Sequence, residues 1–283
     1  MAPLHWPLEA LWQAISPRLP GFTIELLPEL DSTNSELMRR ARAGRTEPVL
    51  LVAQRQTAGR GRLGRQWFSD APHAAVAGDV AHTDGSALTF SLGLPLAPQD
   101  WSGLSLAVGL SVAHSLHPDI RLKWPNDLWW HGRKLAGILI ETANWGAAHA
   151  SRYAVIGVGI NLHPPLAAGL STPPAGLTEL LPGMDAPQAL AWVAEPLVRT
   201  LLVFQAQGFA PLQASFNATD ALAQLPVVLS DGMTGLARGV DATGALLLET
   251  AHGVQRVTSA EVSVRPVGQP LPSVPDTVRG KEG

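Results

Sequence analysis

A run of alternating glycines and arginines follows a short apolar strand, and it constrains the fold more than any other stretch of the chain. The strand is predicted at 49–53, where apolar residues are bounded by polar ones. The run begins at residue 57 and ends in the aromatic pair Trp67 and Phe68. Glycine permits positive φ and close approach of a ligand, arginine is a charged fork suited to phosphate and carboxylate, and Trp67 offers a flat face to a ring. The run predicts a loop that binds an anion carrying a ring system; a solvated basic loop is the alternative that the run alone leaves open.

The same run contains Gly59, Gly61 and Gly64 in the G-x-G-x-x-G spacing of a dinucleotide-binding fingerprint. That fingerprint must open a helix inside a strand–helix–strand unit. Residues 65–72 are too few and too interrupted for a packed helix. The sequence context therefore argues against a Rossmann fold.

Composition narrows the class of protein. The 283 residues suffice for one sizeable core and a small second domain. With 46% hydrophobic and 15% charged residues the chain is globular, and its net charge of −3 argues against bulk nucleic-acid binding. Cysteine is absent, which excludes disulfides and cysteine–zinc sites. No apolar run reaches the roughly 18–20 residues of a membrane span and no secretory signal opens the chain, so we expect a cytoplasmic protein without membrane contact.

Periodicity predicts mixed helices and strands over the first three quarters of the chain. We expect helices within 7–20 and at 35–44, 102–117, 188–207 and 209–216, and strands at 22–27, 87–94 and 154–161. Ser102 is the expected cap of the third helix. Before the second helix stand four polar residues where one cap would suffice, which leaves donors and acceptors for a ligand: Asp31, Ser32, Thr33 and Asn34.

A second informative stretch, 120–141, is predicted to be a β-hairpin that turns at His131 and Gly132. Pro125 indicates a bulge or an edge within it. Lys134 precedes a buried-looking run in which Gly137 leaves room for a close approach, and the glycines of strand 154–161 hint at a ligand lying against the backbone. Polar and charged residues cluster around the paired strands: Lys123, Asn126, Asp127 and Lys134.

The last quarter changes character. Short strands at 225–230, 235–240, 245–250, 254–258 and 262–264 predict a small closed barrel. We expect an N-terminal extension at 1–21, a catalytic domain at 22–217, the barrel at 218–267 and a disordered tail at 268–283. Residues 70–86 are predicted to form a flexible excursion. His73 and His82 within it are expected to be exposed, and His114 and His117 lack a third ligand, so no metal site is predicted.

Six motifs in one order resemble the biotin protein ligases, over residues 22–266. They are Asp31-Ser32-Thr33-Asn34, Gln56 with Gly59-Arg60-Gly61-Arg62, Trp67-Phe68-Ser69, Lys123-Trp124-Pro125-Asn126-Asp127-Leu128, Arg133-Lys134-Leu135-Ala136-Gly137 and Gly159-Ile160-Asn161-Leu162. The resemblance implies an α+β fold: a mixed-sheet biotin/lipoate ligase-like catalytic domain with a small C-terminal SH3-like β-barrel. It also implies two half-reactions, in which biotin and ATP with Mg²⁺ give biotinyl-5′-AMP, and a lysine of a biotin carboxyl carrier protein, or of the carrier domain of acetyl-CoA carboxylase, takes the biotinyl group.

The resemblance further implies roles for individual residues. Biotin would contact Ser32, Thr33, Asn34, Gln56, Gly59, Arg60, Gly61, Arg62, Lys134 and Gly137. ATP would contact Arg62, Trp67, Lys123, Asn126, Lys134 and Asn161. The residues implied in catalysis are Lys134, Arg62, Arg60 and Asp127. Independently of the resemblance, bringing a carboxylate up to a polyphosphate needs fixed cations, and the sequence offers Arg60, Arg62, Lys123 and Lys134. Asp127 either orients or deprotonates the acceptor amine or pairs with Arg60 or another base.

Two departures from the family pattern and two alternatives accompany this interpretation. The chain has no room for the N-terminal DNA-binding domain of many members, so we expect no repressor role and no nucleic-acid partner. Residues 70–86 replace a turn that is usually short. A lipoate or octanoate ligase is the alternative enzyme, and a non-catalytic biotin sensor the alternative of another class; a homodimer through an exposed strand edge is expected only by analogy.

Overall fold

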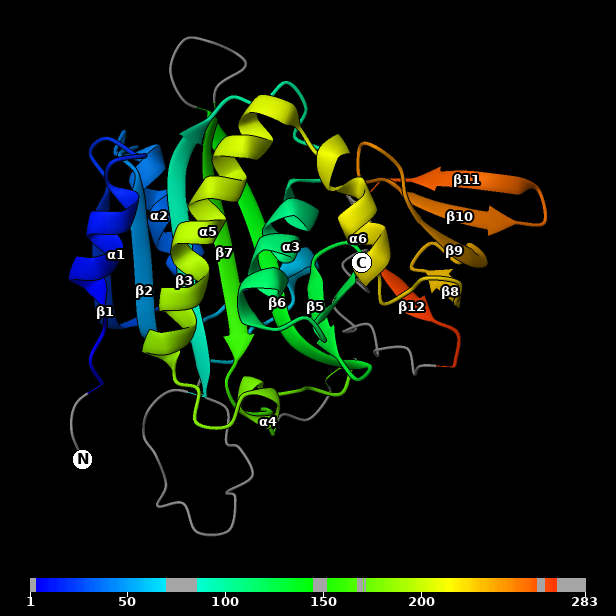
Figure 1. Ribbon diagram of the computed structural model, residues 1–283, viewed down its shortest axis with the longest axis horizontal. Helices are drawn as coiled ribbons and strands as arrows, with labels where there is room; N and C mark the ends of the chain where they lie inside the picture. The colour runs from blue at the N-terminus through cyan, green and yellow to red at the C-terminus, as the bar shows by residue number, and fades with distance from the viewer. Residues whose placement is uncertain are drawn as a thin grey trace, which may run out of the picture.

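The computed structural model describes residues 4–69, 86–144, 152–166, 170, 172–258 and 263–268. They form a seven-stranded mixed sheet and a separate five-stranded antiparallel sheet (Figure 1). The strand order of the large sheet is β1 (Thr23–Leu30), β2 (Val49–Gln56), β3 (Ala87–Leu96), β7 (Arg152–Asn161), β6 (Arg133–Asn144), β5 (Asp127–Trp130) and β4 (Arg121–Lys123). Only β1 and β2 are parallel among these neighbours. The mixed sheet expected from the resemblance is confirmed.

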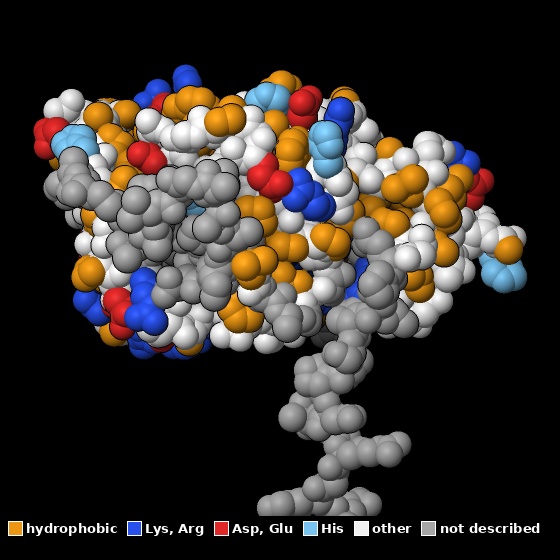
Figure 2. Space-filling model, turned by 90° about the horizontal axis from the view of Figure 1, so that it is seen from below, with side chains coloured by type: hydrophobic (Ala, Val, Ile, Leu, Met, Phe, Trp, Pro, Cys, Tyr) orange, Lys and Arg blue, Asp and Glu red, His pale blue; other side chains and the backbone are white. Residues whose placement is uncertain are grey.

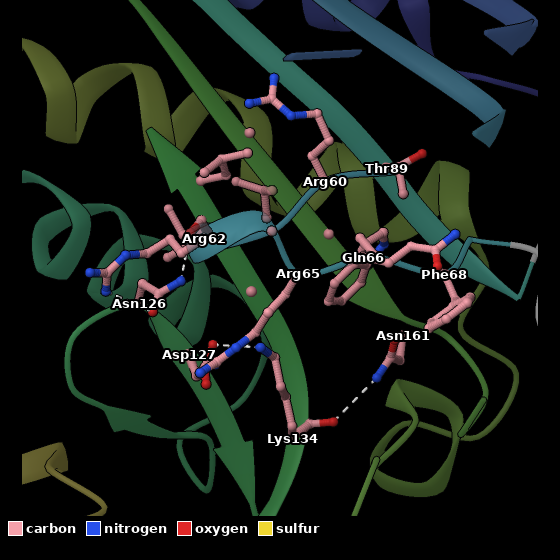
Figure 3. Close-up of a pocket in the computed structure, with 18 of the residues that line it drawn as sticks. Arg60, Arg62, Arg65, Gln66, Phe68, Thr89, Asn126, Asp127, Lys134 and Asn161 are labelled. Atoms are coloured by element: carbon pink, nitrogen blue, oxygen red, sulfur yellow. Dashed lines mark hydrogen bonds and ion pairs between the residues drawn. The ribbon is translucent and has the colours of Figure 1, made fainter. Parts of the chain in front are cut away.

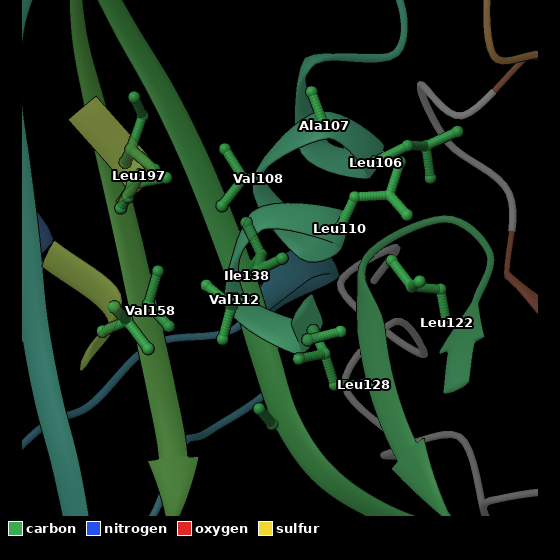
Figure 4. Packing of buried hydrophobic residues seen from close by; sticks show 14 of the residues in the cluster. Leu106, Ala107, Val108, Leu110, Val112, Leu122, Leu128, Ile138, Val158 and Leu197 are labelled. Atoms are coloured by element: carbon green, nitrogen blue, oxygen red, sulfur yellow. The ribbon is translucent and has the colours of Figure 1, made fainter. Parts of the chain in front are cut away.

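Helices cover both faces of the large sheet because apolar side chains of its strands point alternately to one face and to the other. In β2, Leu50 and Val52 face the main core, whereas Val49 and Leu51 face a second cluster. The main core receives α1 (Leu8–Ile15), α3 (Leu104–Leu116) and α5 (Ala186–Gln207), and Figure 4 shows α3 packed against the sheet. The second cluster receives α2 (Thr33–Arg42). The helix predicted within 7–20 is therefore part of the main core.

Helix α5 is buried along one stripe, as its predicted amphipathic pattern requires. Leu190, Val193, Leu197 and Leu201 recur at helical spacing and are all fully buried. By length and composition alone, α5 is apolar enough to cross a membrane. Its apolar stripe instead packs into the protein core, as expected of a core helix.

Two local predictions have informative outcomes. The hairpin turn at His131 and Gly132 is confirmed, and both residues adopt positive φ, 49° and 73°, as a two-residue turn of this type requires. The prediction that Ser102 caps α3 is wrong. The residue before the helix is Gly103, with φ 78° and no side-chain cap, and a Cβ there would lie 2.6 Å from the Phe209 ring. Phe209 therefore leaves no room for a side chain at the residue before this helix.

After α5 the chain passes through η2 (Ala210–Leu212) and α6 (Gln213–Thr219) into the small sheet; the short helix α4 (Leu177–Leu180) precedes α5. The small sheet has the order β11 (Gly253–Val257), β10 (Leu246–Thr250), β9 (Thr234–Val240), β8 (Pro226–Leu229) and β12 (Val264–Pro266). All neighbouring pairs in it are antiparallel, and the short strands predicted for the barrel come together in this one sheet.

The small sheet packs directly on the large one. The indole Nε1 of the fully buried Trp124 donates a hydrogen bond to the carbonyl oxygen of Gly244 at 3.1 Å. Val227, Ala237 and Leu246 of the small sheet belong to the main core. The excursion predicted at 70–86, with His73 and His82, lies outside the described residues apart from Ser86, as does the tail predicted at 268–283 apart from Gly268. The domain boundaries stay predictions.

Candidate active site

A cavity of about 740 Å³ lies where the glycine–arginine loop, α2, the sheet and β12 meet. Residues 60–68 of the loop, the start of α2, strands β6 and β7 and residues 263–265 line it. The structure brings together nearly all of the predicted site residues. Those lining the cavity are Ser32, Thr33, Asn34, Gln56, Arg60, Gly61, Arg62, Trp67, Lys123, Asn126, Asp127, Lys134, Gly137 and Asn161. The remaining one, Gly59, lies just behind the lining, where a Cβ would overlap the carbonyl oxygen of Trp67.

The loop folds back on itself, which explains its glycines. The backbone N–H of Gly61 donates to the carbonyl of Arg65 at 2.7 Å, and that of Trp67 to the carbonyl of Gly59 at 2.9 Å. Between them a single 3₁₀ turn, η1 (Arg62–Gly64), contains two residues with positive φ: Leu63 at 56° and Gly64 at 70°. The compact turn presents several arginine side chains from one short segment.

The room left by the strand glycines is filled by the protein itself. A Cβ at Gly159 would overlap the Trp67 ring, and one at Gly157 would overlap the side-chain amide of Asn34. Opposite Gly159 in the sheet, a Cβ at Gly137 would lie 3.4 Å from both the Trp67 ring and Lys134 Nζ. The expectation that a ligand occupies this space is therefore corrected: these glycines admit Trp67 and Asn34, which form the cavity wall.

Asp127 lies between two lysines beneath the loop. Its Oδ1 is 2.7 Å from Lys134 Nζ and its Oδ2 is 3.8 Å from Lys123 Nζ. Burial alone would raise the pKa of Asp127, but the charges of Lys134 and Lys123 hold that pKa below its usual value. Burial lowers the pKa of Lys123 to about 8, although Asp127 opposes this shift. One predicted alternative was that Asp127 pairs with Arg60 or with another base. In the structure its partners are Lys134 and Lys123, and not Arg60.

Further cations converge on this ion pair. Arg62 donates to Asn126 Oδ1 at 3.3 Å, while the Asn126 amide donates to the Ile138 carbonyl at 2.8 Å. Figure 3 shows Arg65 extended toward Asp127 and Lys134. Arg265 of β12 reaches the same cavity from the small sheet and is only 9% exposed. Around the cavity, the described lining holds six cationic side chains and one carboxylate, Asp127.

Sequence reasoning left two of these cations, Arg65 and Arg265, without a role. Arg65 carries a signal, since it is the third arginine of the glycine–arginine run. Nothing local distinguishes Arg265, which joins the site only because β12 pairs with β8 beside the large sheet.

Arg60 does not join this group. Figure 3 shows its guanidinium directed away from Arg62, Arg65 and Lys134. It pairs with Glu141 on β6, with Nη2 3.0 Å from Oε1, and its side chain is 48% exposed. The predicted grouping of Arg60 with the phosphate-facing cations is not what the structure shows.

On the other side of the cavity is a wall of uncharged polar groups. Gln56 Oε1 accepts hydrogen bonds from the backbone N–H of Thr33 at 2.7 Å and from its hydroxyl at 3.2 Å. Ser91 contacts Thr33 Oγ1 at 2.7 Å and donates to Asn34 Oδ1 at 2.6 Å. Ser32, Thr33 and Asn34 are each 3% exposed, so the polar residues before α2 do more than cap it. The sequence analysis missed two polar residues of the apolar strand β3: Thr89, which lines the cavity, and Ser91, which holds Thr33 and Asn34 without lining it.

Asn161 has a mainly structural position. Its amide donates to the carbonyl oxygens of Lys134 at 3.2 Å and Ala175 at 3.1 Å. These bonds fix the backbone that carries Lys134. In the described residues, no group of three or more His, Asp or Glu side chains could hold a metal ion.

The chain is similar to known proteins over most of its length. Residues 27–161 match the model of the biotin/lipoate A/B protein ligase family, and residues 229–265 match the biotin protein ligase C-terminal domain. The bifunctional ligase/repressor BirA of Escherichia coli is 33% identical over 261 residues, 88% of this chain and 76% of that protein. A biotin–[acetyl-CoA-carboxylase] ligase of Mycobacterium tuberculosis is 32% identical, over 84% of this chain and 88% of that protein.

The fold comparison gives the same answer. The structure of the biotin protein ligase from Aquifex aeolicus in complex with biotin and ATP superposes with a TM-score of 0.68 and 27% sequence identity, covering 86% of this chain and 98% of the other. The matched five-stranded domain corresponds to the SH3-like domain expected from the resemblance. The chain therefore belongs to the biotin protein ligase family and is an enzyme of the ligase class.

Proposed function

We propose that the protein condenses biotin with ATP to biotinyl-5′-AMP and then transfers the biotinyl group to a lysine of a biotin carboxyl carrier protein. The strongest support for this proposal is that two walls of the same cavity differ in chemistry: one is cationic and the other is polar but uncharged. Five cations, without Arg60, and a single carboxylate in the described lining lie near a cluster of buried uncharged donors and acceptors. A biotin carboxylate and a polyphosphate require the cationic wall, whereas the ureido ring of biotin requires the uncharged polar wall.

In the first half-reaction, a biotin carboxylate oxygen attacks the α-phosphorus of ATP, the bond from that phosphorus to the bridging oxygen breaks, and pyrophosphate leaves. Two anions approach each other in this step, so fixed positive charge is required. Lys134 and Arg62 are assigned to the carboxylate and the α-phosphate, with Lys123, Arg65 and Arg265 along the polyphosphate. Mg²⁺ enters with ATP as part of the substrate. Trp67, whose ring packs against Gly159 and Gly137 of the sheet, is assigned to the adenine.

In the second half-reaction, the neutral amine of the acceptor lysine attacks the carbonyl carbon of the mixed anhydride, AMP leaves and the nitrogen loses a proton. Asp127 already accepts a hydrogen bond from Lys134 and faces Lys123. We assign it to holding these lysines in place. No nucleophilic side chain is needed, because the adenylate is itself the activated acyl group.

The polar wall favours biotin over lipoate as the substrate. The lipoyl dithiolane ring offers no strong hydrogen-bonding group, so it could make no use of the polar residues Ser32, Thr33 and Gln56 that line the cavity. Reaction of the purified protein with ATP, Mg²⁺, biotin and a carrier domain tests the proposal. We expect the carrier to gain the mass of one biotinyl group; a gain only with lipoate, or biotin binding without any gain, would overturn it.

The predictions of a cytoplasmic location, of no repressor role and of a possible homodimer stay predictions. On the face shown in Figure 2, the described Lys and Arg side chains lie in small groups among acidic and hydrophobic ones. A DNA-shift assay with the biotin-bound protein and sedimentation velocity check these points.

A further inference from the structure

Glu141 connects the glycine–arginine loop to the polar wall of the cavity. It lies on β6, and its side chain is 22% exposed. Its Oε1 accepts from Arg60 Nη2 at 3.0 Å, and its Oε2 accepts from Arg60 Nη1 at 3.3 Å and from Asn34 Nδ2 at 3.0 Å. One carboxylate thus holds a loop residue and a wall residue at the same time.

The contacts of Asn34 extend this connection into the cavity wall. The same amide nitrogen donates to the Leu139 carbonyl at 3.1 Å, and Asn34 Oδ1 accepts from Ser91. Ser91 in turn contacts Thr33, which donates to Gln56. Because the amide of Asn34 occupies the space that a Cβ on Gly157 would take, it is held by packing as well as by hydrogen bonds.

Backbone bonds from Thr57 and Ala58 to the carbonyls of Leu30 and Asp31, both at 2.9 Å, and the Trp67 ring packed against Gly159 help to attach the loop to the sheet. At its base, Gln56 donates its backbone N–H to Ser69 Oγ at 2.8 Å, and Ser69 Oγ donates to the Gln56 carbonyl at 3.1 Å. Near the middle of the loop, Arg62 contacts Asn126. Arg60 supplies the attachment on the other side, through Glu141 and through Ser35 Oγ at 3.2 Å. An ion pair is the stronger kind of contact among these.

We infer that Glu141 is a positioning residue: by pairing with Arg60 while it holds Asn34, it fixes the loop against the wall and thereby sets how tightly biotin and its adenylate are retained. The part about biotin rests on the proposed function; the part about the loop does not. Arg60 pairs with Glu141, which explains why its guanidinium lies apart from the cations around Asp127.

Limited trypsin digestion of the ligand-free protein tests the loop directly, because Arg62 and Arg65 are cleavage sites within it. Glu141→Gln keeps an acceptor for Asn34 and removes the charge that Arg60 needs. We expect Glu141→Gln and Arg60→Gln each to speed cleavage after Arg62 and Arg65 by about two- to fivefold, the size of a partly exposed ion pair. The double variant should be cleaved no faster than either single one, because both remove the same interaction.

Glu25→Gln is the matched control. Glu25 forms a two-point pair with Arg40 at 2.7 and 2.9 Å, which joins β1 to α2 and does not touch the loop. Cleavage of Glu141→Gln at the wild-type rate, additive effects in the double variant, or equal acceleration in Glu25→Gln would each overturn the inference.

Kinetics test the second part. Glu141→Gln should raise KM for biotin and the release rate of biotinyl-5′-AMP by about two- to fivefold, with kcat for pyrophosphate formation within about twofold of the wild type. A fall in kcat at unchanged KM would overturn the positioning role. If the wild type itself forms no pyrophosphate from ATP and biotin, the proposed function fails, while the digestion result still decides whether Glu141 holds the loop.

Discussion

The carboxylate of Asp127 and the ammonium group of Lys134 lie 2.7 Å apart on neighbouring strands, and Asp127 is only 8% exposed. The hairpin creates this relationship, since Asp127 opens β5, Lys134 lies near the start of β6, and the turn at His131 and Gly132 sets their register. An ion pair formed within one tight hairpin needs little long-range folding to position it. The cation assigned to the reacting carboxylate is therefore held on a rigid element.

Lys134→Ala and Arg62→Ala should each lower the rate of adenylate formation by about 10²–10³-fold, because each removes one fixed positive charge that stabilises the negative charge of the transition state. Biotin- and ATP-dependent pyrophosphate release is the measurement. Arg238→Ala, which removes an arginine paired with Glu249 on the small sheet, serves as the control that should keep wild-type activity. Full pyrophosphate release by Lys134→Ala or Arg62→Ala would show its assigned role to be incorrect.

Gly159→Ala should weaken ATP binding, because the new Cβ would overlap the Trp67 ring and displace it from the sheet. Overpacking of this kind costs about 1–3 kcal/mol, and we expect KM for ATP to rise by about tenfold or more, in line with that range. Gly137→Ala is the control on the facing strand, where the nearest atoms lie at 3.4 Å and include the flexible end of Lys134. Equal KM values for ATP in the two variants would contradict the explanation.

Asp220 should make the stability depend on pH. Burial raises its pKa to about 6, its Oδ1 accepts from the Leu222 backbone N–H at 2.9 Å, and its buried Oδ2 has no hydrogen-bond partner among the described residues. A carboxyl group whose pKa is raised on folding destabilises the protein progressively as pH rises from its unfolded pKa through its folded pKa. The free energy of unfolding of Asp220→Asn should therefore increase relative to that of the wild type by about 2–3 kcal/mol between pH 4 and pH 7.

Urea unfolding at several pH values provides the measurement. Asp231→Asn is the matched control, since exposed Asp231 accepts a hydrogen bond from the backbone N–H two residues on, Met233, at 3.0 Å, as Asp220 does from Leu222. The difference in the free energy of unfolding between Asp231→Asn and the wild type should stay nearly constant over the same pH range. A constant difference for Asp220→Asn as well would refute the effect of burial.

Trp124→Phe should loosen the contact between the two sheets. The substitution leaves the Gly244 carbonyl without its indole donor and opens a void in a fully buried position. We expect a loss of about 2–4 kcal/mol in the free energy of unfolding. Trp192→Phe on α5, where the tryptophan is 46% exposed, should change it by less than about 1 kcal/mol.

Local signals predicted much of this protein. The turn at His131 and Gly132 and the apolar strand before the glycine–arginine run depend on neighbouring residues and occur where predicted. The cap of α2 is one of the four polar residues named for it, Ser32, but the helix begins at Thr33, two residues before the predicted start. The cap of α3 was predicted wrongly: the residue before the helix is Gly103, against which Phe209, far away in sequence, packs. Six motifs in one order sufficed to indicate the family, since their spacing along the chain carries that information without a structure.

By itself the sequence determined which chemical groups are present and how each strand and turn is built, because backbone preferences and hydrophobic periodicity act over a few residues. Only the tertiary structure decided which groups meet. It paired Arg60 with Glu141 and brought Arg265 to the cavity from a second sheet. It also filled the space at Gly157 and Gly159 with Asn34 and Trp67. The physical reason is that such contacts join residues tens to hundreds of positions apart, and sheet register and core packing, not local propensity, set their distances.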